Sequence, residues 1–369
     1  MAESIALIVA FLIPLGFLFL VLNLNLYQRK EYYKFNVATV LWGLFAYALA
    51  AMVNSYLLRQ GYISRDQLIR YAAPVSEEIL KALILIYLVR RPEFNFVVDG
   101  AIYGFGAGIG FAVIENYEYI ANRPEIALTL ALSRVFSTNL VHAAGSGLIG
   151  SILAYMRTER NLNAGLISLA GMLLAISLHM GFNSMVSSGA FLIVAILVGT
   201  VGAGMITLII QRGLKLQRQL ILENLGVKDR VTTSEATAVN EIKSLDELLA
   251  PLRIMFGEEK ASQTEALLLK QAEIGIKRGL LEKMQDEKLR SATLEEVERL
   301  TKEMNDARKA IGLYCMQYVR EVYLKAKINV WEATTLKIEK GEGKKTGGFD
   351  WTVELPGRMT KSSRGGDET

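Results

Sequence analysis

Residues 99–116 read DGAIYGFGAGIGFAVIEN, an apolar stretch with an acidic residue at its start and a glutamate near its end. Five of these residues are glycines: Gly100, Gly104, Gly106, Gly108 and Gly110. Small residues at such spacings let neighbouring helices approach closely inside a membrane. We therefore predict a membrane-spanning helix that packs tightly in a bundle, with Asp99 capping the start of the helix rather than reacting.

Apolar segments continue on both sides of this stretch. Seven of them approach or exceed the roughly 20 residues that span a bilayer, and they lie near residues 4–27, 37–58, 67–89, 97–120, 127–155, 164–187 and 190–211. Charge is segregated from them, because 28 of the 41 Lys and Arg residues and 26 of the 37 Asp and Glu residues follow residue 211. The sequence predicts an all-α chain: a polytopic membrane bundle of about seven helices over residues 1–211, followed by a C-terminal cytoplasmic helical region.

The basic residues indicate an orientation. The first segment lacks a preceding basic region and a small-residue cleavage site, so we expect a retained anchor rather than a signal peptide. Alternate connections gather cations on one side, at Arg29, Lys30, Lys34, Arg90, Arg91, Arg157, Arg160, Arg212, Lys215 and Arg218, against Arg59, Arg65 and Arg123 on the other. The positive-inside rule predicts a multi-pass protein of the cell membrane with its N-terminus outside and its C-terminus in the cytoplasm.

Polar residues interrupt four consecutive apolar segments at overlapping depths. They are Glu77, Glu78 and Lys81 on the third, Glu115 on the fourth, His142 on the fifth, and His179 with Asn183 on the sixth. The chain has only two histidines, and both are in this group. Because an ionised group at the centre of a membrane helix costs about 2.5–3.5 kcal/mol on insertion scales, such residues are functional candidates.

Each of these residues also has a structural explanation. Lys81 can neutralise one glutamate of its own helix, His142 can join two helices by a hydrogen bond, and Arg134 can balance a buried carboxylate. Lys81 can neutralise only one glutamate, however, so at least one carboxylate remains without a counter-charge. Two chemistries fit that excess: a glutamate that activates water beside donors for the oxyanion, or two histidines and a glutamate that hold Zn²⁺. No HExxH motif supports the metal.

Several of these residues lie in motifs that resemble a known family. EEILK at 77–81, DGAIYGFGAGIGFAVIEN at 99–116, His142, and HMGFN at 179–183 resemble the PrsW family of intramembrane proteases. That family is related to the CAAX prenyl endopeptidases and to the bacteriocin-immunity membrane proteins. The resemblance covers about residues 64–187 and implies an intramembrane endopeptidase that acts on a membrane-anchored protein, such as an anti-sigma factor, near the extracytoplasmic side.

The resemblance also implies residue roles. Glu77 or Glu78 would activate water, while His179 and Asn183 would support the oxyanion or bind a metal. Where the CAAX endopeptidases have FxxxH, Phe111 is followed by Glu115 in this chain, which leaves His142 as the candidate for that role. A glutamic mechanism needs no cofactor; a metal-dependent one would use zinc, with His142, His179, Glu115 and Glu78 as its ligands. The sequence leaves both mechanisms open.

A second class of function fits the same residues. The chain would then be a non-catalytic polytopic scaffold, or a membrane protein whose buried charges bind an ion or a lipid. A transporter should show inverted repeats or paired broken helices, and the sequence has neither. The net charge of +4 is too small and too dispersed to indicate nucleic acid as a partner.

The C-terminal part carries helix signals. We expect a linker at 212–240, a helical hairpin or coiled coil at 241–340 and a disordered tail at 341–369. Ser244 with Glu247, and Thr293 with Glu296, read as capping boxes that open helices. The second helix carries a heptad seam at Val297, Leu300, Met304, Ala307, Ile311, Tyr314 and Tyr318. Its expected partner is segment 264–285, the alternative being a homo-oligomer formed through these helices. The single cysteine, Cys315, excludes an intrachain disulfide.

Overall fold

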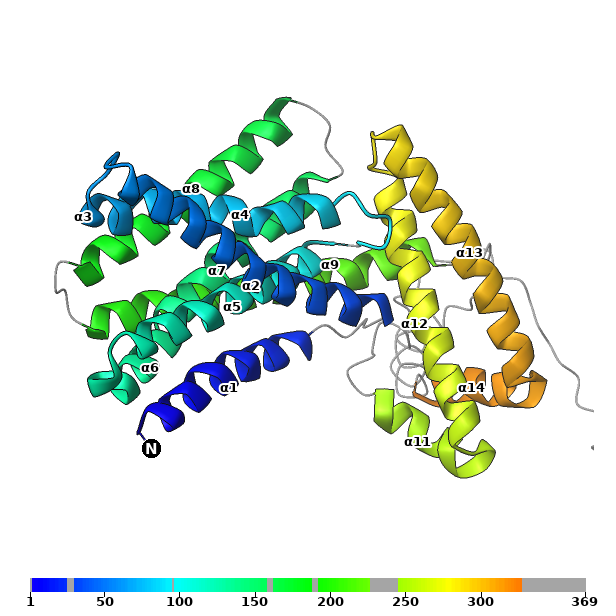
Figure 1. Cartoon of the computed structure of the whole chain (residues 1–369). Helices are drawn as coiled ribbons and strands as arrows, with labels where there is room; N and C mark the ends of the chain where they lie inside the picture. The colour runs from blue at the N-terminus through cyan, green and yellow to red at the C-terminus, as the bar shows by residue number, and fades with distance from the viewer. Residues whose placement is uncertain are drawn as a thin grey trace, which may run out of the picture. The chain divides into compact units, whose positions relative to one another are not determined.

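Helices build nearly all of the structure, a computed structural model that describes residues 2–24, 30–94, 96–157, 162–187, 192–225 and 245–326 (Figure 1). No strand occurs within these ranges. Nearly all of them belong to one compact unit, Met1–Tyr323, and the rest of the chain is a second unit, Leu324–Thr369. The all-α prediction is confirmed.

The described helices follow one another along the chain, most of them after connections of a few residues. In chain order they are α1 (Ala2–Leu22), α2 (Lys30–Arg59), α3 (Arg65–Gln67), α4 (Ala73–Leu88), α5 (Val97–Ala121), α6 (Ala127–Val135), α7 (Thr138–Met156), α8 (Leu162–Ser187), α9 (Leu192–Asn224), α11 (Leu245–Phe256), α12 (Glu258–Leu281), α13 (Glu287–Ile311) and α14 (Leu313–Ala326). A π-helical segment, Leu68–Ala72, joins α3 to α4, and a 3₁₀ turn, Pro124–Ile126, precedes α6.

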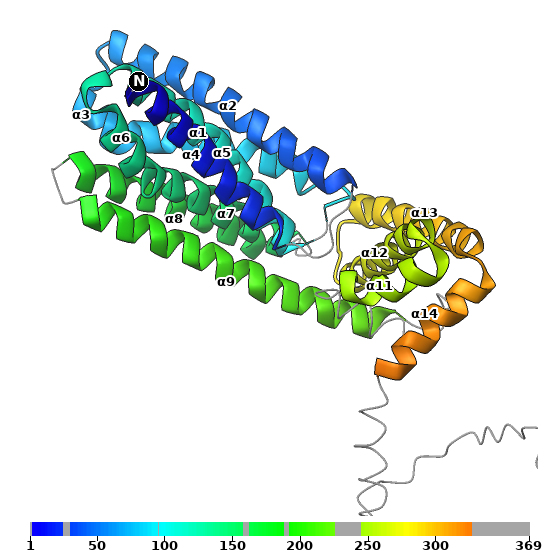
Figure 2. The ribbon, with the colours of Figure 1, turned by 90° about the horizontal axis from the view of Figure 1, so that it is seen from below.

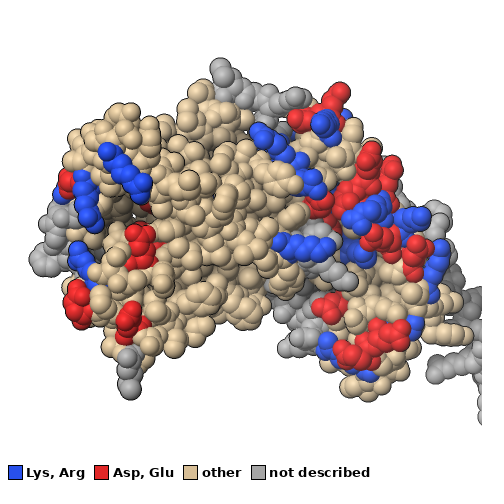
Figure 3. Space-filling view, viewed as in Figure 1, with Lys and Arg blue, Asp and Glu red and all other residues tan. Residues whose placement is uncertain are grey.

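Six helical stretches of the described residues are long and apolar enough to cross a membrane. They are Ala2–Leu22, Tyr32–Arg59, Val97–Ala121, Pro124–Met156, Ala164–Val186 and Ile196–Asn224. The segment expected at 67–89 is not among them, because α4 has 16 residues and carries three charged side chains. Figure 3 shows a broad uncharged surface over the bundle, while charged side chains crowd over α12 and α13. The predicted membrane bundle is confirmed, with six stretches rather than seven that meet these criteria.

The segment 65–88 nevertheless runs between the same two ends of the bundle as its neighbours. At one end, the connection after α4 meets the end of α7, since Arg157 donates to the carbonyl of Arg91 at 3.0 Å. At the other end, Asn183 near the end of α8 donates to the carbonyl of Ile69 at 2.9 Å. Two of the cations predicted for the cytoplasmic side, Arg91 and Arg157, therefore lie together at one end.

Helix α5 is the centre of the bundle, and Figure 2 shows α2 and α9 on opposite sides of α5 and α7. A Cβ atom added at any of three of its glycines would lie within 2.4 Å of a backbone oxygen of α7: Gly100, Gly104 and Gly108. A Cβ on Gly110 would lie 2.2 Å from the carbonyl oxygen of Val40 on α2. Backbones touch directly on both faces of α5, so the predicted close packing is confirmed.

The start of α5 differs from the expectation. The helix begins at Val97, with Phe96 in the N-cap position and no side-chain cap. Asp99 lies inside the first turn and is 2% exposed. The cap prediction for Asp99 is therefore wrong, because the helix starts two residues earlier; a carboxylate in the first turn still favours the helix through its dipole.

The C-terminal hairpin forms, with helix boundaries other than those expected. α12 packs against α13, as predicted. α13 begins at Glu287, where the carboxylate of Asp286 accepts from the amide of Leu289 at 3.1 Å. Thr293 lies within the helix and donates to the carbonyl of Leu289. The capping box at Thr293 is therefore wrong, and Ser244 lies outside the described residues.

The heptad seam is shorter than predicted. Its members on α13 are buried at Val297, Leu300, Met304 and Ile311. Gly312 then ends the helix with a φ of 87°, a value that favours glycine. Tyr314, at the start of α14, is 82% exposed. The prediction of one continuous helix to Tyr318 is therefore wrong. The buried residues of the shorter seam pack within the core of the hairpin. Upstream, α9 runs on to Asn224 into the expected linker, while the predicted tail at 341–369 lies outside the described residues.

The α5–α7 contact generates a stability prediction. We expect Gly104→Ala to lower the thermal unfolding midpoint of the detergent-solubilised protein, because the new methyl group would lie 2.1 Å from the carbonyl oxygen of Ser146. Overpacking of this kind costs about 1–3 kcal/mol. Gly16→Ala on α1 is the control, since no atom lies within 4 Å of that added carbon. Equal midpoints for the two variants would contradict the prediction.

Candidate functional site

A buried ion pair on α4 forms one wall of the site. Lys81 Nζ lies 2.7 Å from Glu78 Oε1, and both side chains are almost completely inaccessible to solvent. The three-residue spacing puts them on the same face of the helix. The lysine therefore neutralises Glu78 rather than Glu77, and the sequence could not separate these two options.

His142 on α7 lies between a cation and a carboxylate. Its Nδ1 is 2.9 Å from Lys81 Nζ, and its Nε2 is 2.8 Å from Glu115 Oε2. An ammonium group only donates hydrogen bonds, so Nδ1 accepts and Nε2 carries the proton that goes to Glu115. His142 is therefore held as one tautomer by residues from two other helices.

His179 on α8 is oriented by both glutamates of α4. Its Nδ1 lies 2.9 Å from Glu78 Oε1, and its Nε2 lies 3.8 Å from Glu77 Oε2. Because Glu78 accepts the Nδ1 proton, Nε2 presents its lone pair toward Glu77. The two imidazole rings are edge to face, with centroids 4.7 Å apart. A carboxylate that orients a histidine in this way is typical of metal-binding histidines.

Arg134 and Asn116 complete the polar network, and neither was predicted as a site residue. Arg134 Nη2 lies 2.7 Å from Glu115 Oε2, and its Nε donates to Asn116 Oδ1 at 2.8 Å. Arg134 lies in the last turn of α6, just before the break that separates α6 from α7. Its charge within an apolar segment was the sequence signal, but only the structure shows that it faces Glu115.

A polar cavity of about 670 Å³ opens beside this network. α2, α3, the π-helical segment, α4, α5 and α8 line it, and Glu77, Glu115 and Asn183 are among its lining residues. Glu78 is not, so the two adjacent glutamates differ: Glu77 faces the cavity and Glu78 lies behind it. Asn183 also caps the carbonyl of Ile69 inside the π-helical segment, so it shapes the wall of the cavity.

Three of these residues could hold a metal ion. Glu77, His142 and His179 each offer one ligand atom, and the three atoms lie within 4.8 Å of one another. Two imidazoles and one carboxylate match a common catalytic zinc set. His179 fits directly, through its free Nε2, whereas His142 would have to exchange Lys81 or Glu115 for the ion. The sequence suggested Glu78 and Glu115 as the carboxylate ligands of the metal, whereas this group contains Glu77.

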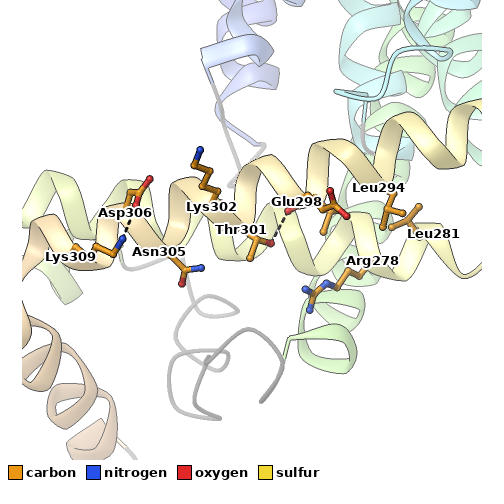
Figure 4. Close-up of a pocket in the computed structure, with 10 residues that line it drawn as sticks. Arg278, Leu281, Leu294, Glu298, Thr301, Lys302, Asn305, Asp306 and Lys309 are labelled. Carbon is orange, nitrogen blue, oxygen red and sulfur yellow. Dashed lines mark hydrogen bonds and ion pairs between the residues drawn. The ribbon is translucent and has the colours of Figure 1, made fainter.

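Another cavity of about 670 Å³ lies between α12 and α13 (Figure 4). Its walls mix cations such as Lys302 with anions such as Glu298, and none of the predicted site residues contributes to it. All six of those residues instead belong to the network or to the cavity within the bundle: Glu77, Glu78, Glu115, His142, His179 and Asn183.

These features define a multi-pass membrane protein whose helix bundle encloses a carboxylate and imidazole site. The chain belongs to the PrsW family: the family described as PrsW family intramembrane metalloprotease matches residues 31–226, which is more than half of the chain. The match includes every site residue named above.

Among individual proteins, the chain is similar to Protease PrsW of Clostridioides difficile (strain 630). The two are 29% identical over 127 residues, which cover 33% of this chain and 53% of the relative. The chain thus spans about half the length of that relative. No solved structure matches the chain.

The buried ion pair predicts the effect of removing its cation. Lys81→Met should destabilise the protein by about 3–5 kcal/mol, because Glu78 would remain buried without its charged partner. Lys309→Met is the matched control, since Lys309 pairs with Asp306 at the same three-residue spacing but in solvent, where an ion pair contributes about 0–1 kcal/mol. Denaturation of both variants in detergent measures the difference, and similar losses would contradict it.

Proposed function

We propose that the protein is an intramembrane endopeptidase that hydrolyses a peptide bond of a membrane-anchored protein near the extracytoplasmic side. One observation carries the proposal: Glu77, His142 and His179 converge inside a membrane bundle, next to a polar cavity. Hydrolysis in a membrane needs water at the scissile bond, and a polar cavity of about 670 Å³ provides room for it. The family description and the name of the relative support the same activity.

The two adjacent glutamates take different roles in this proposal. Glu77 is the reacting carboxylate, since it lines the cavity and lies 3.8 Å from His179 Nε2, beyond hydrogen-bond distance. Glu78 is a positioning residue, because its Oε1 is committed to Lys81 and His179. The sequence allowed either glutamate to act on water; the cavity favours Glu77.

Glu77, His142 and His179 are the residues that would hold a metal ion. A bound Zn²⁺ would polarise the scissile carbonyl and make a nucleophile of water at neutral pH. In that case Glu115, which lines the same cavity, would accept a proton from water through Oε1, since its Oε2 is held by Arg134 and His142. Without a metal, Glu77 itself would be the general base, and the histidines would face the developing oxyanion.

The first test substitutes the reacting carboxylate. Glu77→Gln should reduce cleavage of a single-span substrate about 10²–10⁴-fold, the range for losing a general base, and should also lower the zinc content of the purified protein. Glu118→Gln is the control, since Glu118 lines the same cavity but is exposed. Full cleavage by Glu77→Gln would refute the proposal, whereas lost cleavage with no zinc in the wild-type protein would favour the glutamic mechanism.

The second test concerns orientation, which decides on which side the cavity opens. The cavity is at the end of the bundle opposite Arg91 and Arg157, so the proposed side of cleavage requires that end to face outward. A reporter that works only in the cytoplasm should therefore be active when it is fused after Lys215. If protease added to intact cells digests that fusion, the C-terminal part faces outward and the predicted orientation is wrong.

A further inference from the structure

The mechanism leaves one buried cation of the cytoplasmic helices unused. Lys277 on α12 is 1% exposed. Its Nζ donates to the carbonyl of Pro92 at 2.6 Å and lies 3.5 Å from Glu273 Oε1, one turn earlier. A charge withdrawn from water in this way is costly unless its contacts are good. The contact with Pro92 joins α12 to the membrane bundle.

Pro92 belongs to the connection between α4 and α5, the two helices that carry the glutamates of the site. A second cation holds the same connection from α7: Arg157 donates to the carbonyls of Arg91 and Phe94. Lys277 and Arg157 therefore bind three carbonyls of one short turn, those of Arg91, Pro92 and Phe94. Three helices of the site, α4, α5 and α7, and helix α12 meet at this point.

Apolar packing seats α12 against the bundle around that contact. Phe96, in the same connection, belongs to the apolar core of the cytoplasmic helices. On α12, a Cβ added at Gly275 would lie 3.1 Å from the Cα of Ile221 on α9, and one at Gly279 would lie 2.7 Å from the side chain of Leu220. α12 therefore packs closely on α9 at Gly275 and Gly279, which share one helix face. Lys277, two residues from each, points away from that face to Pro92.

A displacement of this connection would reach the site. The start of α5 is confined, because a Cβ on Gly213 of α9 would lie 2.6 Å from Val98. From there α5 continues as one helix to Glu115, with backbone contacts to α7 at Gly100, Gly104 and Gly108. Packed helices move as rigid elements rather than deforming continuously. A shift of the α4–α5 connection would therefore change the 2.8 Å distance between Glu115 Oε2 and His142 Nε2.

We propose that the helices α11–α13 form a docking unit that fixes the α4–α5 connection, and that Lys277 is a positioning residue for the site through this connection. The effect on catalysis rests on the proposed function, whereas the attachment does not. The family match ends at residue 226, so this role belongs to the part of the chain beyond the matched region. In this proposal, the helices α11–α13 hold the α4–α5 connection in place and thereby position the site.

The test removes the attachment without leaving a buried charge alone. The double variant Lys277→Met with Glu273→Gln takes away both charges of the pair. The matched control is Lys270→Met with Glu303→Gln, since these residues form a partly exposed ion pair between α12 and α13. Both variants are made in the full chain, and amide hydrogen exchange is followed in residues 89–98 and 73–80.

We expect the Lys277 variant to exchange faster in both segments, with an unchanged thermal midpoint, while the control exchanges like the wild type. The kcat of the Lys277 variant on a single-span substrate should fall about 10- to 100-fold with little change in KM, as when a reacting group is misplaced by about 1 Å. Unchanged exchange at 89–98 would overturn the attachment, and unchanged exchange at 73–80 or unchanged kcat would overturn the positioning role. If the wild type cleaves nothing, the proposed function fails, and exchange at 73–80 still decides the coupling.

Discussion

Charge inside a membrane bundle has to be paired, and this constraint organises the site. The pairing runs through four helices: Glu78 to Lys81 on α4, on to His142 of α7, to Glu115 of α5 and to Arg134 of α6. Each member holds the next at 2.7–2.9 Å, so removing one leaves another buried without its partner, which costs several kcal/mol. Glu77 lies outside this chain of contacts, and that is why it is free to face the cavity.

The same helix contact builds both the bundle and the site. Glycines of α5 bring its backbone against α7, and a Cβ on Gly108 would lie 2.4 Å from the carbonyl oxygen of His142. Two turns farther along α5, Glu115 reaches the imidazole of that histidine at 2.8 Å. A larger residue in the seam would push the two helices apart by more than a hydrogen bond tolerates. Packing and chemistry therefore depend on the same backbone approach.

The site is held at both ends of the bundle by different means. At the end where the cavity lies, Asn183 satisfies the carbonyl of Ile69 in the π-helical segment that leads into α4. At the other end, Arg157 and Lys277 bind carbonyls of the turn that leads out of α4. α4 carries both glutamates, so these contacts restrain it along its length. The π-helical segment is a feature that often marks a functional site in a helix.

The sequence by itself determined the class of fold and singled out six candidate residues for the site. Apolar segments of spanning length, glycines at helix-contact spacing, and the only two histidines placed among intramembrane carboxylates were enough for both, because each is a property of one segment. Only the tertiary structure decided that Lys81 pairs with Glu78, that Arg134 faces Glu115, and that Glu77 joins the histidines. Helical periodicity shows which residues share a face, but not how that face is rotated toward a neighbour. The contacts that decide the chemistry join residues 61 and 101 positions apart, and packing alone sets that rotation.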